Sequence, residues 1–126
     1  MREFETGATR DKDDNKYDYE GFLSPIALER FAEYMHKHRR QADGAMRDSD
    51  NWQKGIPIKA YRKSLVRHVL QCWGAWRDHD MRDDKGEPID EEEALCAIMF
   101  NVQGLLHELA AARRRGEKFE SLARHG

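Results

Sequence analysis

A short stretch near the middle of the chain combines side chains that could bind a flat, charged ligand. Arg47 and Lys54 carry positive charge, Asn51 can donate and accept hydrogen bonds, and Trp52 presents an aromatic ring just before the turn-forming residues 55–57. A tryptophan can stack on a flat ring while cations bind charged oxygens. The structural alternative is that Trp52 fills the core and Asn51 caps a turn. The loop spans about fifteen residues, and loops of that length in a compact domain are usually functional or disordered.

This loop leads into a helix that we predict over residues 59–78. Its apolar stripe has helical spacing and consists of Tyr61, Leu65, Val69, Cys72 and Trp76. His68 falls on the edge of that stripe and should be half-buried. It is therefore either a hydrogen-bonded structural histidine or a ligand or base near the loop.

A second helix is predicted to begin at Ser24-Pro25 and to end between residues 38 and 41. Serine caps free amides and proline is favoured at the first helical position. The apolar stripe of this helix consists of Leu28, Phe31, Ala32 and Met35. Glu29 and Glu33 lie four residues apart, so they either hold a divalent cation or are solvated or paired with a lysine or arginine.

A third helix should begin at Asp90, with Glu93 completing a capping-box spacing. Its main stripe consists of Leu95, Ile98, Met99, Val102, Leu105, Leu106 and Leu109. Apolar residues on its other faces indicate a central helix or one that faces a partner subunit. Asn101 interrupts this surface and must either bond a neighbouring helix or point into a pocket. Glu91 and Glu92 lie at its N-terminal end, where carboxylates also suit the helix dipole.

Composition limits the class of protein. The chain has 126 residues, a formal net charge of -2 and 39% apolar residues. This balance argues against binding to a nucleic-acid polymer, and the modest apolar content favours a dimer or larger assembly. Cys72 and Cys96 are expected to be reduced core residues of a cytoplasmic protein. The polar N-terminus predicts no signal peptide, and no apolar run approaches the ~20 residues of a membrane span.

We therefore predict a single all-α domain over residues 1–126, with three main helices and long functional loops. It divides into an N-terminal arm (1–22), a helical core (24–115) and a C-terminal tail (116–126). Tyr17, Tyr19 and Phe22 should anchor the arm on the body of the domain. The common phosphate-loop, dinucleotide-binding, hydrolase and zinc-protease motifs are absent from the sequence.

Several sequence blocks together resemble one family. They are Glu5–Asp11, Lys16–Pro25, Asp50–Pro57, Ser64–His68, Phe100-Asn101 and Gly104–Glu108. Over most of its length, the chain resembles the phage and prophage family called dATP/dGTP diphosphohydrolase, N-terminal domain. The resemblance implies an all-α, oligomeric (dimeric or tetrameric) enzyme of MazG-like type in the cytoplasm of a bacterial host. Such enzymes use Mg²⁺, Mn²⁺ or possibly Co²⁺ to split purine deoxynucleoside triphosphates into monophosphate and pyrophosphate.

The resemblance also implies roles for particular residues. Metal ligands would come from Glu91, Glu92 and Asp78. Catalysis would involve Glu92, with His68 orienting water or ligating metal. Phosphates would be bound by Arg47, Lys54 and Arg67. The base would stack on Trp52 or Tyr61, and its edge would be read by Asn51 or Asn101. The chain departs from the MazG-like pattern in having no clean ExxE and ExxD pair.

Two other functions fit the same sequence. The first is a non-catalytic nucleotide-binding protein that sequesters a nucleotide from host defence, which the missing carboxylate motif favours. The second is a small helical interaction protein that uses its long apolar helix as a dimer face.

Overall fold

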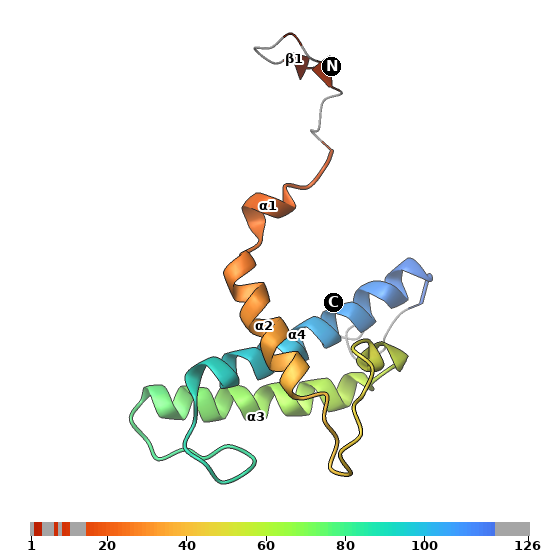
Figure 1. Cartoon of the computed structure of the whole chain (residues 1–126). Coiled ribbons are helices and arrows are strands. Elements are labelled where there is room, and N and C mark those ends of the chain that lie inside the picture. Colours follow the sequence, from red (N-terminus) through yellow and green to blue (C-terminus); the bar gives the residue numbers. More distant parts are fainter. Residues whose placement is uncertain (1, 4–6, 8, 11–14, 118–126) are drawn as a thin grey trace.

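A computed structural model describes residues 2–3, 7, 9–10 and 15–117 of the chain. Three main helices form the body: α2 (Pro25–Lys37), α3 (Ile58–Trp76) and α4 (Glu91–Arg114). Shorter elements are the helix α1 (Tyr19–Phe22), the 3-10 helix η1 (Asn51–Lys54) and two paired two-residue strands, β1 (Arg2–Glu3) and β2 (Thr9–Arg10). Figure 1 shows α3 and α4 side by side and antiparallel, with α2 crossing them. The predicted all-α class is confirmed.

The two predicted helix starts are built by side-chain caps. Ser24 Oγ accepts a hydrogen bond from the Ala27 amide at 3.0 Å, and Asp90 Oδ1 accepts one from the Glu93 amide at 3.0 Å. Each cap satisfies an amide that has no partner within its own helix. The Glu93 side chain does not return to Asp90 but bonds α2, so only half of the predicted capping box forms.

The fully buried residues of α4 are mostly small, whereas its leucines are half-buried or exposed. The buried residues of α4 are Ala94, Cys96, Ala97, Asn101, Gly104 and Ala112. Gly104 marks the closest approach, because a Cβ atom there would lie 2.2 Å from the Tyr61 ring. Leu95, Val102 and Leu106 of the predicted apolar stripe are exposed, so α4 is not a central helix buried on all sides within one copy. The missing side chain at Gly104 lets the two helices approach closely.

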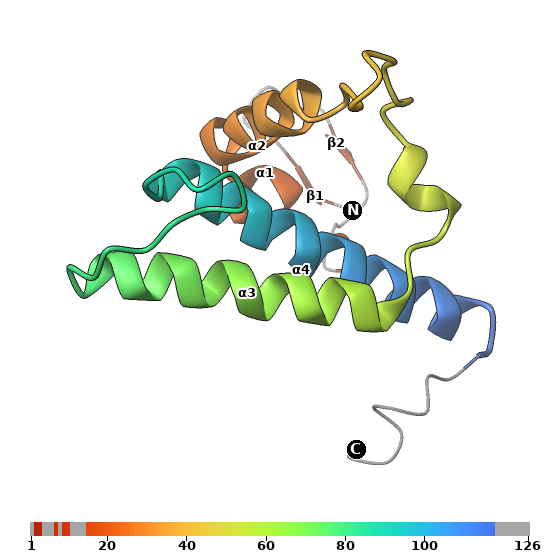
Figure 2. The ribbon, with the colours of Figure 1, turned by 90° about the horizontal axis from the view of Figure 1, so that it is seen from below.

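Charged side chains join α2 to α4. Arg30 donates from Nε to Glu92 at 2.7 Å and from Nη2 to Glu93 at 3.0 Å, and it lies 3.7 Å from Glu33. Lys37 donates to the same Glu93 carboxylate. Figure 2 shows the resulting order of layers, with α4 between α2 and α3. The predicted alternative for Glu33, an ion pair, is the one found.

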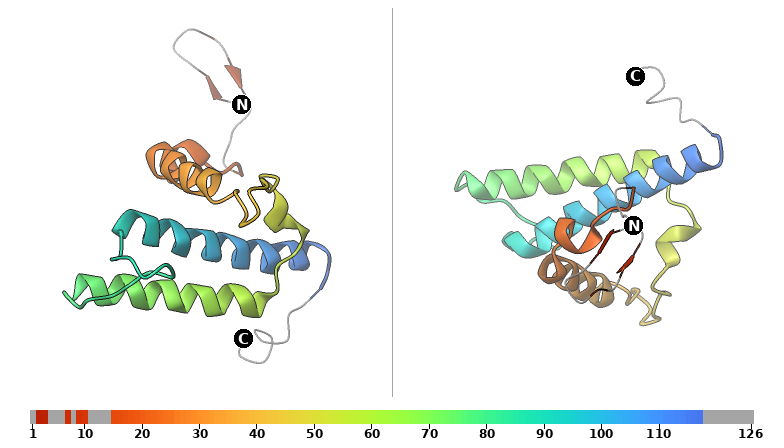
Figure 3. Two further views of the ribbon diagram at one scale, coloured as in Figure 1. Left: turned by 60° about the horizontal axis from the view of Figure 1, so that its bottom comes forward. Right: turned by 90° about the horizontal axis from the view of Figure 1, so that it is seen from above.

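Residues 15–22 of the predicted N-terminal arm extend away from the body. Figure 1 shows α1 and the first turns of α2 projecting away from the α3–α4 pair, and the left view of Figure 3 shows both helices on the α4 side of that pair. Tyr17 is 74% exposed and Phe22 is 78% exposed, and Tyr19 is exposed as well. The prediction that these residues anchor the arm is therefore wrong, because no helix of the body lies opposite them.

Two connections form compact hairpins. In the first, Arg40 pairs with Met46, and Gly44 occupies the tip with a φ of 86°. In the second, Arg82 pairs with Pro88, and Gly86 has a φ of 81°. Glycine adopts these left-handed angles without a steric penalty. The predicted long loop is thus an ordered hairpin followed by η1.

Two further findings concern helix composition. Cys72 and Cys96 are buried free thiols, as predicted.

Among the described residues, α4 is long and apolar enough to cross a membrane by length and composition alone, a test that core helices also pass.

Candidate functional site

A pocket of about 650 Å³ opens where the C-terminal half of α2 meets the first hairpin and η1. Phe100 of α4 and Lys85 of the second hairpin also line it. Its remaining lining residues are Ala32, Tyr34, Met35, His36, His38, Arg39, Arg40, Arg47, Asp48, Ser49, Asn51, Trp52 and Ile56. The volume falls within the range of ordinary small-molecule sites.

Positive charge dominates the polar lining. Arg39, Arg40, Arg47 and Lys85 are cations, whereas Asp48 is the one carboxylate among the lining residues. The hairpin holds two of the arginines: Arg39 Nε donates to the Arg47 carbonyl at 2.8 Å, and the Arg47 amide donates to the Arg39 carbonyl at 2.8 Å. Such a set of donors suits an anion with several oxygens.

Aromatic rings form the other part of the lining. Trp52 is half-buried and packs edge-to-face on His107 of α4, with ring centroids 4.9 Å apart. Tyr34 packs on His38 at 4.3 Å, and Phe100 contributes from α4. Because Trp52 packs on His107 of α4, its ring is already ordered, and a ligand that stacks on it would cost little conformational entropy of the side chain. Flat rings beside cations suit a ligand that is both aromatic and anionic.

His38 links this lining to the α2–α4 ion pairs. Burial lowers the pKa of His38, the adjacent Lys37 charge lowers it further, and Glu93, 3.8 Å away, opposes both. The lowered pKa keeps His38 largely neutral near pH 7, so there it can donate one hydrogen bond and accept another.

The structure brings together three of the predicted substrate-binding residues. Arg47, Asn51 and Trp52 all line the pocket, as their spacing in the loop suggested. Lys54 lies at the end of η1, is exposed, and is not among the lining residues.

Two other predicted residues lie in the core. Tyr61 is only 1% exposed and packs against Phe100 and Gly104, and its hydroxyl has no hydrogen-bond partner among the described residues. Asn101 is 4% exposed and donates from Nδ2 to the Ala97 carbonyl at 2.8 Å, one turn back. Both side chains are therefore structural in this conformation.

Arg67 and His68 lie against the second hairpin instead of the pocket. Arg67 Nη2 donates to Asp84 at 3.2 Å, and Gln71 donates to the same carboxylate at 3.3 Å. Burial raises the pKa of Asp84, but the Gln71 and Arg67 contacts outweigh this and lower it. Burial lowers the pKa of His68, and Arg67 lowers it further. These residues fasten the hairpin to α3.

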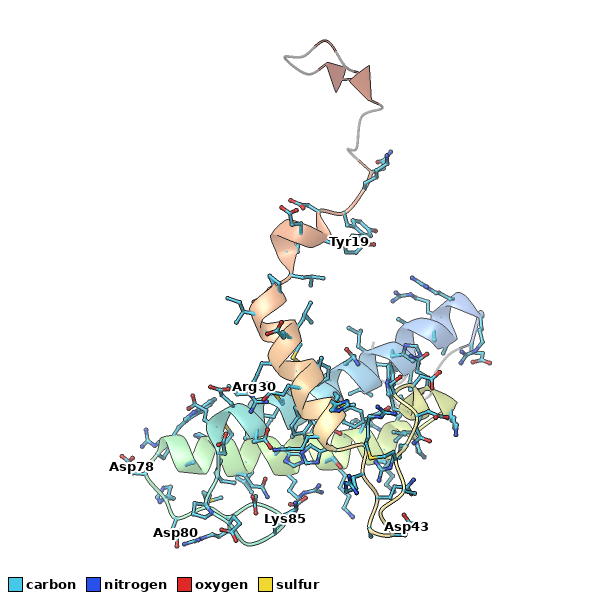
Figure 4. All side chains as sticks on the ribbon, viewed as in Figure 1. Tyr19, Arg30, Asp43, Asp78, Asp80 and Lys85 are labelled. Atoms are coloured by element: carbon cyan, nitrogen blue, oxygen red, sulfur yellow. The ribbon has the colours of Figure 1, made fainter. Side chains whose placement is uncertain are left out.

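The predicted metal ligands are engaged elsewhere. Glu91 accepts a hydrogen bond from Trp76 Nε1 at 2.6 Å, and Glu92 accepts one from Arg30 at 2.7 Å. Asp78 follows the end of α3 with a φ of 64°, at the far end of α3 in Figure 4. Within residues 15–117 and the described N-terminal positions, no three histidine, cysteine or acidic side chains come together as a metal site. In a single copy, these residues do not fit a divalent cation.

Sequence reasoning missed the part of the pocket supplied by α2 and the second hairpin. The missed polar and aromatic residues are Tyr34, His36, His38, Arg39, Arg40 and Lys85. The available signal was the run 36–40, with five consecutive basic or histidine residues at a predicted helix end. Such a run also suits a helix C-terminus, so it did not point to a site.

The chain matches no protein-family model, no curated protein and no solved structure.

Proposed function

We propose that the pocket binds a purine nucleotide, with the phosphates against the cations and the base against the aromatic rings. The observation that carries this proposal is the lining itself: four cationic side chains beside Trp52, Tyr34 and Phe100 in a pocket of about 650 Å³. Arg47 would hold phosphate oxygens, and Trp52 would stack on the base. Asn51 would bond the edge of the base.

Binding without turnover fits this site better than hydrolysis. Hydrolysis of a triphosphate by a MazG-like enzyme needs carboxylates that hold metal ions beside the phosphates. Glu91 and Glu92 are instead bonded to Trp76 and Arg30, outside the pocket lining. A protein that sequesters a nucleotide needs only the cations and the rings. Pyrophosphohydrolysis with Mg²⁺, Mn²⁺ or Co²⁺ remains a prediction that the same preparation can test.

Calorimetry would test binding directly. The full chain would be titrated with dATP, dGTP, their ribonucleotide counterparts and pyrimidine controls, in EDTA and again with Mg²⁺. We expect purine nucleotides to bind in EDTA. Arg47→Ala should weaken binding roughly tenfold or more, because a charge-assisted hydrogen bond is worth about 1.5–3 kcal/mol. Trp52→Ala should weaken it by a similar factor, because stacking on a base is worth about 1–3 kcal/mol.

Arg77→Ala and Trp73→Ala are matched controls, since both residues are exposed on or beside α3 and lie outside the pocket lining. They should bind nucleotide as the wild type does. The proposal is wrong if no nucleotide binds, or if Arg47→Ala and Trp52→Ala bind as tightly as the controls. Chromatography of the same mixtures would detect monophosphate and pyrophosphate. Their appearance, and their loss in Glu92→Ala, would establish the enzyme instead of a sequestering protein.

A further inference from the structure

Four large apolar side chains of α3 are exposed along one stripe. Val66, Val69, Trp73 and Trp76 follow at intervals of three, four and three residues, and each is at least 42% exposed. At roughly 100° per residue, this spacing lines them up along the helix as in the seam of a coiled coil. Exposed apolar groups at this spacing are typical of a helix that packs on a partner.

The stripe faces neither α4 nor the second hairpin. Tyr61 marks the side of α3 that faces α4, because it packs under Gly104. Arg67 marks the hairpin side, because it bonds Asp84. Trp73 lies about 120° round the helix from both Tyr61 and Arg67. The stripe therefore occupies the remaining third of the helix.

Helix α4 carries a matching stripe. Leu95, Met99, Val102 and Leu106 follow at intervals of four, three and four residues, and Leu106 is 62% exposed. Leu95, Val102 and Leu106 are exposed, whereas Met99 is half-buried and lies about 60° round the helix from Cys96, which contacts α2. The two stripes meet where Trp76 of α3 donates its indole hydrogen to Glu91 of α4. Together these eight residues form one surface, which we call the outer face.

Charges at the ends of α4 complement each other under a two-fold rotation. The helix begins with Glu91, Glu92 and Glu93 and ends with Arg113 and Arg114. Glu91 and Arg113 each lie eleven residues from Val102. At roughly 100° per residue, both residues point within about 20° of the direction in which Val102 points. If two copies of α4 pack antiparallel about Val102, Glu91 of each copy lies opposite Arg113 of the other. A surface that complements itself in this way suits a two-fold dimer.

The exposed area leaves room for such an interface. The chain exposes 10543 Å², compared with roughly 7000 Å² for a compact monomer of 14.8 kDa. The segment that carries Tyr17, Tyr19 and Phe22 accounts for part of this excess. A stable interface needs about 800 Å² from each partner, well within the difference.

We propose that the occupant of the outer face is a second copy of this chain, packed antiparallel about Val102 so that the two α3–α4 pairs form a four-helix core. The cations and rings of the pocket lie on the α2 side of α4, so this interface is independent of the proposed nucleotide binding.

The test is the oligomeric state of the full chain. Sedimentation equilibrium should give a dimer at micromolar concentrations. Val66→Glu and Leu106→Glu should each weaken the dimer at least roughly tenfold, because each places a charge in the apolar centre. Both positions are exposed in one copy, so circular dichroism should show intact helices. Ile26→Glu is the matched control: Ile26 is 83% exposed but lies on α2, and the variant should remain dimeric.

A charge exchange tests the antiparallel register. Arg113→Glu should weaken the dimer, and adding Glu91→Arg should restore it. A monomeric wild-type chain would overturn the proposal. So would dimers that persist in both Val66→Glu and Leu106→Glu. A double variant that dimerises no more tightly than Arg113→Glu alone would also overturn it. Wild-type chain that stays monomeric and binds phospholipid vesicles would assign the outer face to a membrane surface and would also overturn it.

Discussion

At the scale of single residues, Gly104 determines how closely α3 and α4 can pack. Its position beneath the Tyr61 ring leaves no space for a side chain, since a Cβ atom would lie 2.2 Å from the ring. Tyr61 is buried and cannot swing away without opening the core. The glycine is therefore required by the close approach of the two helices, and not by its backbone angles.

Gly104→Ala should destabilise the protein by about 1–3 kcal/mol, the usual cost of forcing extra atoms into a packed core. Alanine favours a helix more than glycine does, so a purely helical effect would have the opposite sign. Urea unfolding followed by circular dichroism measures the change. Gln103→Ala, an exposed neighbour on the same helix, should alter stability by less than about 0.5 kcal/mol. A Gly104→Ala protein as stable as the wild type would show that Tyr61 can move aside.

Some of the predicted site residues line the pocket and others do not, and the difference is whether their positions depend on one loop or on the packing of two helices. Arg47, Asn51 and Trp52 share one loop, so their spacing alone indicated that they act together. Tyr61 and Asn101 have equally suitable chemistry, but helix packing buries them. A sequence pattern does not distinguish a tyrosine that lines a pocket from one that lies beneath a glycine of another helix.

At the scale of elements, one carboxylate of α4, that of Glu93, accepts hydrogen bonds from two cations of α2. Burial would raise the pKa of Glu93, but hydrogen bonds from Lys37 and Arg30 outweigh this and lower it. A lowered folded-state pKa means that Glu93 stabilises the docked helix above its ordinary pKa of 4.5. That contribution is lost as the pH falls through the lower value in the folded protein.

Acidification from about pH 6 to about pH 3 should therefore loosen α2 before the α3–α4 pair unfolds. Amide chemical shifts of α2 recorded by NMR across this range would show the change. Glu93→Gln should have a loosened α2 already at pH 6 and should change little on further acidification. Glu20→Gln, on the projecting arm, should follow the wild-type titration. Equal pH profiles for Glu93→Gln and the wild type would show that other contacts hold the helix.

The helices themselves were predictable because their signals are local. The caps at Ser24 and Asp90 lie next to the residues that they bond. Caps and apolar spacing gave the bounds of α2 and α3, and the start of α4, to within a few residues. Which side of α4 is buried was not predictable, since the leucines carry most of its apolar area. The contribution of α2 to the pocket was also missed, because the hairpin that brings 36–40 beside Trp52 is a tertiary feature.

At the scale of the whole molecule, stability and assembly should be coupled. If the outer face is buried between two copies, unfolding of the dimer releases two chains, and mass action then favours the folded state at higher concentration. In one copy, residues such as Trp73 and Leu106 are more than half exposed. Burial of these groups in the dimer would add to a core that is otherwise built largely of small residues.

Raising the protein concentration tenfold should raise the Tm by about 3–5 °C for a dimer of this size. Scanning calorimetry at several concentrations would measure this, with reversibility checked by a second scan. Val66→Glu should have a lower Tm that does not depend on concentration, whereas Ile26→Glu should keep the wild-type dependence. A wild-type Tm that is constant over two decades of concentration would indicate a monomeric fold.

The three tryptophans of the chain are divided between its two proposed surfaces: Trp52 lines the pocket, whereas Trp73 and Trp76 lie on the outer face. Indole emission depends on the polarity around the ring, so the protein carries separate optical reporters for the two events. A chain that retains only Trp52 reports occupancy of the pocket. One that retains only Trp73 and Trp76 reports burial of the outer face. Ligand capture and self-association can thus be followed separately by intrinsic fluorescence, without an added dye.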